Sequence, residues 1–319
     1  MNITGIHVFK GVSEKSYSEH ILLIQTLSAI EWKKNGPIHL YTTEKDLIFF
    51  KKMGMDALYD NINTEVLEQP DKIYWPHFGA ATKMKVLDSI QEFPVAFIDN
   101  DLIYKDKLDE SILNYDITYL HDEGRFWRNY PDMSLLGKRK GYQFPDIPEL
   151  NTCNPINVGF FIMNSKELKE RYCKLALDYM TKNNGLSKKV AWANPDLRKF
   201  WKPLFVEQRL LSAVVDNGGF TRNQLFPYTY YGDTCNWTHI DGGSRMMSST
   251  LFKIERFTWF HLWGEKVAYK ERNFKPLKII MFYQLLNTIF NLKNTDYSQI
   301  AWNVILWLEE TGSNKEYNI

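Results

Sequence analysis

The sequence predicts an α/β protein built on a mainly parallel sheet that is flanked by helices. Short apolar runs alternate with longer segments of helical spacing over residues 1–120, and strands that are joined through helices run parallel. The run Val95–Ile98 is apolar at every position, as expected of a strand covered on both faces. Ligands of such open sheets bind beyond the carboxyl ends of the strands, so the residues that follow each strand are the first candidates for a site.

Apolar spacing and stop residues give the elements in order along the chain. Short apolar runs predict strands, and they are found at residues 6–9, 38–41, 95–98, 117–120 and 157–164. Apolar residues three and four positions apart predict helices, and they are found at residues 17–34, 44–53, 80–90, 167–180, 205–217, 277–290 and 300–309. Glycine ends three of these helices, at Gly36, Gly54 and Gly218.

Composition argues against several classes of protein. Hydrophobic residues make up 44% of the 319 residues, which is ample for a core and argues against disorder. The 39 Lys and Arg residues nearly balance the 38 Asp and Glu residues, so no overall basic field exists to hold nucleic acid. The 3 cysteines form no CxxC pair, which argues against a disulfide scaffold or a structural zinc site and favours a reducing compartment.

The sequence shows no targeting segment. Its amino terminus lacks the basic region and apolar run of a signal peptide. The best candidate for a membrane span, residues 279–290, is shorter than the roughly 18 apolar residues required and contains Gln284 and Asn287. A cytoplasmic protein without a transmembrane segment is therefore expected.

Two carboxylates follow the strand Val95–Ile98 directly, in the sequence Asp99-Asn100-Asp101. In an extended chain Asp99 and Asp101 would project to the same side, roughly 6–7 Å apart. They would then share one Mg²⁺ or Mn²⁺ ion, whose charge neutralises a diphosphate and makes it a better leaving group. The alternative is a simple turn after a strand, since Asp and Asn both favour turns.

The order of the motifs resembles that of the GT-A glycosyltransferases, in particular the glycogenin-like group and related bacterial proteins of unassigned substrate. The first landmark is the strand that runs into Asp99-Asn100-Asp101. Three more follow along the chain, namely an Asn-x-Gly strand that begins at Asn157, a segment that begins Glu207-Gln208, and a His-x-x-Gly segment that begins at His261. The resemblance covers most of residues 1–275 and implies a Rossmann-like, GT-A type sheet.

The resemblance implies a metal site and a nucleotide-sugar donor. In this family the DxD motif and a carboxyl-terminal histidine bind the cation, which places Asp99, Asp101 and His261 around Mn²⁺ or Mg²⁺. A neutral imidazole beside two carboxylates suits Mn²⁺. UDP is the nucleotide most frequent in the family. From the residues alone, His261 would rather be assigned as a buried histidine of a strand.

The resemblance also implies residues that contact the donor. The ends of the first two strands read the base and ribose, Asn157 and Gly159 border the sugar, and Gly264 lets the backbone approach the diphosphate. The donor-binding residues so implied are Phe9, Lys10, Tyr41, Thr42, Lys83, Asn100, Asn157, Gly159, Gly264 and Lys266.

Three of these assignments leave alternatives open. Lys85 competes with Lys83, because the register of their helix is not settled, and either lysine could be a surface charge. Lys270 competes with Lys266, because the lysine spacing after Gly264 departs from the family's usual pattern. Tyr41 could serve ordinary packing.

Glu207 and Gln208 are the catalytic candidates beside the anomeric carbon, and Asp233 is an alternative base that would activate the acceptor. A glycogenin-like mechanism retains the anomeric configuration and needs no strong general base. An inverting enzyme would use Asp233 or Glu207 as that base. An aspartate that follows a glycine, as Asp233 does, is more often a turn residue.

The resemblance also suggests a division of the chain. Residues 1–275 form the glycosyltransferase domain, with a nucleotide-binding half at 1–123 and a sugar and acceptor half at 152–275. The long segment 124–151 is expected to be a lid or acceptor platform, or a surface loop anchored by aromatic residues such as Tyr142. Residues 276–319 form a helical extension that packs on the domain, mediates self-association or touches a membrane surface peripherally.

Two other functions compete with transfer of a sugar to the hydroxyl of a glycan, lipid-linked or other acceptor. A sugar-nucleotide pyrophosphorylase would show a Gly-rich basic loop after the first strand, where residues 9–14 hold one glycine and one basic residue. A catalytically inactive carbohydrate- or nucleotide-binding protein of the same fold would have lost metal ligands first, and Asp99, Asp101 and His261 are all present.

Overall fold

The computed structural model describes residues 2–11, 19–69, 81–122, 140–183, 205–226, 259–261 and 275–311, together with Ile73 and Met133. In residues 259–261 and 275–281 it describes the backbone alone. The chain forms a mixed α/β structure with a seven-stranded, mostly parallel sheet and with helices at its carboxyl-terminal end, which confirms the predicted fold class.

The seven strands of the main sheet lie in the order β3-β2-β1-β4-β7-β6-β8. They are β1 (Thr4–Val8), β2 (Ile38–Tyr41), β3 (Asn61–Asn63), β4 (Val95–Ile98), β6 (Ile117–Tyr119), β7 (Phe160–Met163) and β8 (Arg222–Gln224). β2 runs parallel to β1 and β3, and β8 runs parallel to β6, whereas β7 is antiparallel to β6. A second sheet pairs β5 (Leu102–Tyr104) with β9 (Trp259–His261) in antiparallel register.

The helices are α1 (Glu19–Trp32), α2 (Glu44–Met53), α3 (Glu65–Glu68), α4 (Ala81–Ser89), α5 (Lys166–Lys182), α7 (Leu210–Gly218), α9 (Lys275–Asn291) and α10 (Thr295–Glu310). A π-helix at Phe205–Arg209 leads into α7, and 3-10 turns occur at Met55–Leu58, Glu110–Asn114 and Pro148–Asn151. None of the helices in the described ranges is both long and apolar enough to cross a bilayer.

The predicted elements 38–41, 44–53 and 95–98 coincide with β2, α2 and β4 at both ends. For α2 the ends are fixed by caps, because the Thr43 side chain accepts from the Asp46 amide and Gly54 adopts a φ of 73°. The predicted strand 157–164 is shorter, since β7 begins at Phe160. The predicted helix 205–217 begins as a π-helix, and the polar strands β3 and β8 are not predicted by the sequence.

By their contacts the residues fall into two compact units. Unit 1 comprises residues 1–63, 98–108 and 229–319, and unit 2 comprises residues 64–97 and 109–228. The domain boundaries that the family resemblance implies, at residues 123/124, 151/152 and 275/276, stay predictions.

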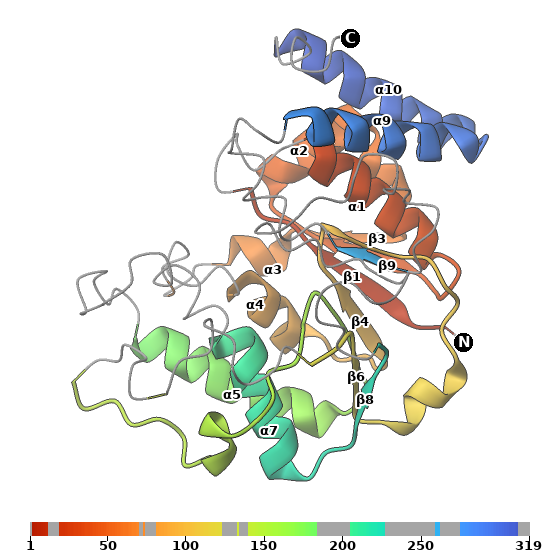
Figure 1. Cartoon of the computed structure of the whole chain (residues 1–319). Helices are drawn as coiled ribbons and strands as arrows, with labels where there is room; N and C mark the ends of the chain where they lie inside the picture. Colours follow the sequence, from red (N-terminus) through yellow and green to blue (C-terminus); the bar gives the residue numbers. More distant parts are fainter. Residues whose placement is uncertain are drawn as a thin grey trace. The chain divides into compact units, whose positions relative to one another are not determined.

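In unit 1 the carboxyl-terminal helices cover the amino-terminal ones (Figure 1). α9 and α10 contact each other and α1, and α10 also contacts α2. The rings of Phe49 in α2 and Trp307 in α10 lie 5.7 Å apart, and the Asn303 amide donates to the Met53 carbonyl at 3.0 Å. This cover explains why most residues of α1 are buried, polar ones such as Gln25 and Thr26 included, because a helix buried in this way needs partners all around it.

In unit 2 the helix α5 packs against α4 and α7. Lys169 of α5 is buried, and its ammonium group donates to the carbonyls of Asp88 and Ile90 at 3.3 and 3.2 Å. Those carbonyls lie at the carboxyl-terminal end of α4, where a helix leaves its last acceptors without partners inside the helix. In the sheet, the rings of Phe97 in β4 and Phe161 in β7 stack 5.2 Å apart.

Candidate functional site

The strand order of the main sheet reverses at β1. β2 and β3 follow on one side of β1, whereas β4 lies on its other side. Sites in α/β proteins form at the carboxyl ends of strands where the order reverses in this way. The residues that follow β1, β2 and β4 include most of the donor and metal candidates of unit 1.

Asp99-Asn100-Asp101 forms a turn between β4 and β5. The Leu102 amide donates to the Asp99 carbonyl at 3.0 Å and closes the turn. The prediction that residues 99–101 are extended is therefore wrong, because this hydrogen bond closes a turn there. Asp101 is 2% exposed, whereas Asp99 is half-buried.

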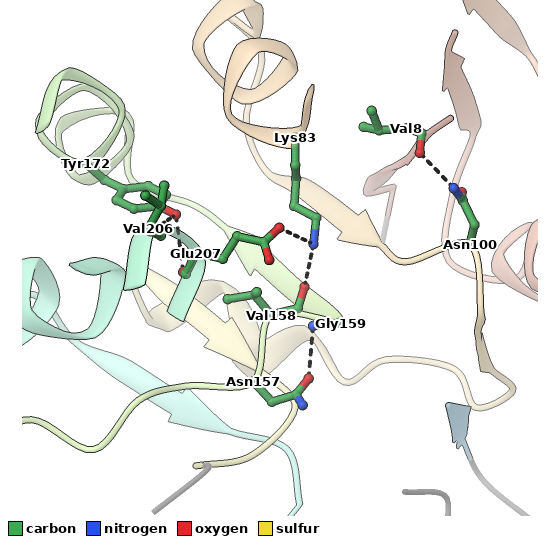
Figure 2. Close-up of polar contacts among 9 residues, drawn as sticks. All are labelled: Val8, Lys83, Asn100, Asn157, Val158, Gly159, Tyr172, Val206 and Glu207. Carbon is green, nitrogen blue, oxygen red and sulfur yellow. Dashed lines mark hydrogen bonds and ion pairs between the residues drawn. The ribbon is translucent and has the colours of Figure 1, made fainter. Parts of the chain in front are cut away.

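Asn100 ties this turn to the end of β1. Its Nδ2 donates to the Val8 carbonyl at 2.8 Å (Figure 2), while its Oδ1 is buried and has no hydrogen-bond partner in the described part of the chain. The Thr42 hydroxyl, fully buried directly after β2, likewise has none among the described residues. Buried polar atoms normally have partners, so the ends of β2 and β4 each hold an oxygen that a bound group could contact, although other buried atoms, such as Gln25 Oε1, also have no partner among the described residues.

His261 is brought close to the same turn in unit 1 by backbone pairing. β9 lies antiparallel to β5, with His261 opposite Leu102, the residue that follows Asp101. The backbone segments that carry the three predicted metal ligands therefore lie near one another in unit 1, although His261 is far from the others in sequence. The imidazole lies outside the described side chains, among which no group of three His, Cys, Asp or Glu residues is placed to hold a metal ion.

The predicted base and ribose residues lie side by side at the ends of β1 and β2. The Phe9 amide donates to the Tyr41 carbonyl at 2.9 Å, and the Thr42 amide donates to the Asn63 carbonyl at 3.0 Å. The Phe9 ring is buried 5.2 Å from that of Phe50, so it serves the core. Lys10 and Tyr41 are half-buried.

Asp46 holds together the segments that follow β1 and β2, and it is absent from the candidates predicted from the sequence. Its buried carboxylate accepts from the Gly11 amide at 2.9 Å and from the Thr43 hydroxyl at 2.6 Å. The segment after β1 is thereby fastened to the start of α2. The spacing Thr-x-x-Asp is a helix-capping pattern, so the sequence did contain a signal for this residue.

In unit 2 the structure brings the donor candidate Lys83 to the catalytic candidate Glu207 (Figure 2). Lys83 Nζ lies 3.4 Å from Glu207 Oε1 and donates to the Val158 carbonyl at 3.1 Å. The two side chains are 12% and 18% exposed. Lys85, the competing lysine, instead donates to the Gln69 carbonyl after α3.

Asn157 and Gly159 shape the turn that precedes β7. The buried Asn157 Oδ1 accepts from the Gly159 amide at 2.9 Å, and the Val158 carbonyl between them accepts from Lys83. The Asn157 side chain thus supports the polar contact of Lys83. Contact of Asn157 and Gly159 with a donor sugar stays a prediction.

The π-helix that carries Glu207 and Gln208 is braced by Tyr172 of α5 (Figure 2). The fully buried Tyr172 hydroxyl donates to the carbonyls of Val206 and Glu207 at 2.9 and 3.2 Å. Burial, together with the Glu207 carboxylate, raises the pKa of Tyr172 well above its usual value, so the hydroxyl keeps its proton. Gln208 is 9% exposed, and its Oε1 has no hydrogen-bond partner within the described ranges.

Tyr172 is a second residue that sequence reasoning missed. It occupies an ordinary core-facing position of α5, and no motif marks it. A π-helix is frequently found at functional sites, because its wider turn frees carbonyls from the regular bonding pattern. Here the Tyr172 hydroxyl donates to two carbonyls of the π-helix, those of Val206 and Glu207.

The remaining candidates Asp233, Gly264, Lys266 and its competitor Lys270 lie outside the described residues. So does most of the segment 124–151. Within its described part, the Tyr142 ring lies 5.6 Å from that of Phe144 and 5.7 Å from that of Tyr179 in α5. For Tyr142 these contacts are those of a loop anchored by its aromatic side chains.

No protein-family profile and no curated protein matches the sequence. Two solved structures of the glycosyltransferase GlyE of Streptococcus pneumoniae TIGR4, one in the apo form, are similar at 12% and 11% identity with a TM-score of 0.34. Each match covers 70% of this chain and 45% of the GlyE chain, so the chain spans less than half of that protein. The nucleoside-diphosphate-sugar pyrophosphorylase of Vibrio cholerae RC9 is similar at 10% identity and a TM-score of 0.39, covering 70% and 92%. Likenesses this distant leave the activity to be inferred from the residues themselves.

Proposed function

We propose that this chain is a metal-dependent glycosyltransferase. It would move a sugar from a nucleoside-diphosphate sugar, with UDP the first nucleotide to test, to an acceptor hydroxyl, with retention of the anomeric configuration. A GT-A-like binding protein without turnover is the alternative that the experiment below separates from it.

The observation that carries the proposal is the pairing of β5 with β9. It sets His261 opposite Leu102, directly beside the turn that holds Asp99 and Asp101. A carboxylate pair alone is weak support, since Asp and Asn favour turns. A histidine brought beside that pair from a distant segment is not explained by turn preference.

Asp99, Asp101 and His261 fit a divalent cation by the chemistry of their ligand atoms. Carboxylate oxygens suit Mg²⁺ and Mn²⁺, and an added imidazole nitrogen favours Mn²⁺. A cation bound there would neutralise charge that develops on a leaving diphosphate. The protein's own part is to hold the turn that carries the carboxylates, and the hydrogen bonds from Leu102 to the Asp99 carbonyl and from Asn100 to Val8 fix the backbone of that turn.

Three residues of unit 2 are also given roles in the reaction. Lys83 is proposed to pair with donor phosphate, while Glu207 and Gln208 on the π-helix are proposed to face the anomeric carbon. Fixed charges of this kind are usually the largest contribution to catalysis of such transfers. The Tyr172 hydroxyl supports the positions of Glu207 and Gln208, because it holds the backbone of the π-helix that carries them.

Calorimetric titration of UDP, with and without Mn²⁺, tests the proposal. We expect binding that depends on Mn²⁺ and that Asp101→Asn and His261→Gln each weaken by more than about tenfold, the scale on which metal sites respond to losing even an outer partner. Asp106→Asn is the matched control, because Asp106 is exposed in the same segment. Binding that passes this test would then justify assays of UDP-sugar hydrolysis and transfer.

The outcomes separate the alternatives. No binding of UDP, GDP or their sugar conjugates with either Mn²⁺ or Mg²⁺ would show that Asp99-Asn100-Asp101 is a structural turn. Metal-dependent binding without hydrolysis or transfer of any sugar tested would favour the binding protein. Release of nucleoside triphosphate from a UDP-sugar and pyrophosphate would favour a pyrophosphorylase.

A further inference from the structure

The ion pair between Lys83 and Glu207 is enclosed but loosely seated. Its N···O distance of 3.4 Å exceeds the 2.7–2.9 Å of a well-formed charge-assisted hydrogen bond. Lys83 is closer to the Val158 carbonyl, at 3.1 Å. The neutral carbonyl therefore holds the ammonium group, while the carboxylate lies near it without optimal contact.

The backbone on both sides of this pair is fixed by buried groups. The Asn157 side chain holds the turn that aims the Val158 carbonyl at Lys83. The Tyr172 hydroxyl holds the carbonyl of Glu207 itself. With both backbones held, the part of Glu207 that can move is its side chain, which is 18% exposed.

We infer that Glu207 is an internal competitor for an anion site on Lys83, and that a diphosphate group takes the site by displacing the carboxylate. A diphosphate carries more negative charge and more acceptor oxygens than one carboxylate, and a lysine ammonium is a common point-charge partner of phosphate. Displacement leaves the Glu207 carboxylate without Lys83 only while the anion is bound. This inference deepens the proposed function, in which Lys83 holds donor phosphate.

Competition has a consequence that a simple binding site lacks. If Glu207 helped to bind the anion, its removal would weaken binding. If it competes, its removal strengthens binding, because an anion that reaches Lys83 then has no carboxylate to displace and no negative charge of Glu207 to repel it. For a pair of this exposure, the expected gain is about three- to tenfold.

The test is titration of inorganic pyrophosphate into the whole chain in the presence of EDTA. Excluding metal keeps any cation site at Asp101 from contributing, so this assay and the UDP assay with Mn²⁺ fail independently. The variants are Glu207→Gln, Lys83→Met and the double variant, with Asp178→Asn as control. Asp178 forms an exposed pair with Lys182 in α5 of the same unit, so its substitution changes the net charge equally.

Glu207→Gln is expected to bind pyrophosphate about three- to tenfold more tightly than the unmodified protein, and Asp178→Asn is expected to bind it equally. Lys83→Met and the double variant are expected to lose binding, with Lys83→Gln as a second variant if circular dichroism shows that the methionine disturbs the fold. Equal or weaker binding by Glu207→Gln overturns the inference. So does binding that persists in the double variant, or no binding in any variant.

Discussion

His7 of β1 offers a test of the packing in unit 1 that is independent of any activity. The side chain is fully buried, with Nδ1 3.0 Å from the Tyr59 hydroxyl and Nε2 3.0 Å from the Ser28 hydroxyl. Gln25 donates to the Tyr59 oxygen at 2.8 Å, so the Tyr59 proton is directed to Nδ1 and Nε2 carries the proton of a neutral ring. Burial lowers the pKa of His7 to about 3.

The sign and size of the effect follow from the two protonation states. An unfolded histidine has a pKa of about 6.5, so below that pH the unfolded chain binds a proton that folded His7 refuses. The free energy of unfolding therefore falls as the pH drops through 6.5, by about 1.4 kcal/mol per pH unit until about pH 3. Between pH 8 and pH 5 the loss that His7 contributes is about 2 kcal/mol.

Urea unfolding of the unmodified protein and of His7→Gln at pH 8, 7, 6 and 5 measures this contribution. Glutamine is neutral at every pH and keeps groups that can bond to Ser28 and Tyr59. The unmodified protein is expected to be the more stable at pH 8, and its advantage is expected to shrink by about 2 kcal/mol at pH 5. Other titrating groups are shared and cancel in the difference. Parallel pH curves for the two proteins would refute the assignment of His7 as a buried neutral ring.

Two further substitutions test the packing of each unit by the same unfolding assay. Lys169→Met removes the donor to the carbonyls of Asp88 and Ile90 and is expected to cost about 1–3 kcal/mol, whereas Lys174→Met, at an exposed position of α5, is expected to change little; equal effects would contradict the capping role. Gly36→Ala would place a Cβ 2.3 Å from the Ile3 carbonyl oxygen and is expected to cost more than about 2 kcal/mol. Gly141→Ala, at a φ of 86° with nothing within 4 Å, should cost about 1–2 kcal/mol from backbone strain alone. A greater loss of stability for Gly141→Ala than for Gly36→Ala would contradict the clash expected at Gly36.

The parts of the fold that the sequence predicts are those where local and tertiary preferences agree. β4 is apolar at every position and buried at every position, and α2 ends at a glycine that adopts a left-handed conformation. The strands β3 and β8 escape prediction because they stand at the two ends of the strand order. An edge strand pairs on one side only and can carry polar side chains, and the sequences Asn-Ile-Asn and Arg-Asn-Gln show no strand pattern.

The candidate site likewise has parts that the sequence predicts and parts that it does not. The position of Asp99-Asn100-Asp101 after a central strand follows from the sequence, whereas its turn depends on one hydrogen bond from Leu102. The pairing of Lys83 with Glu207 depends on how α4 and the π-helix approach each other, and a π-helix inserts a single residue that leaves no trace in apolar spacing. Tyr172 could not be singled out, since a buried tyrosine in a helix is usually a packing residue.

The cover that α9 and α10 give to α1 and α2 also sets an order of events during synthesis. Asn303 and Met53 are separated by 250 positions, and Lys52 and Glu310 by 258. At about 5–20 residues per second, the ribosome takes roughly 12–50 s to make the chain between Met53 and Asn303. During that time the apolar surface of α1 lacks its cover, whereas all segments of unit 2 have already been made by residue 228. We therefore expect unit 2 to fold first, and nascent unit 1 to be the part that chaperones bind.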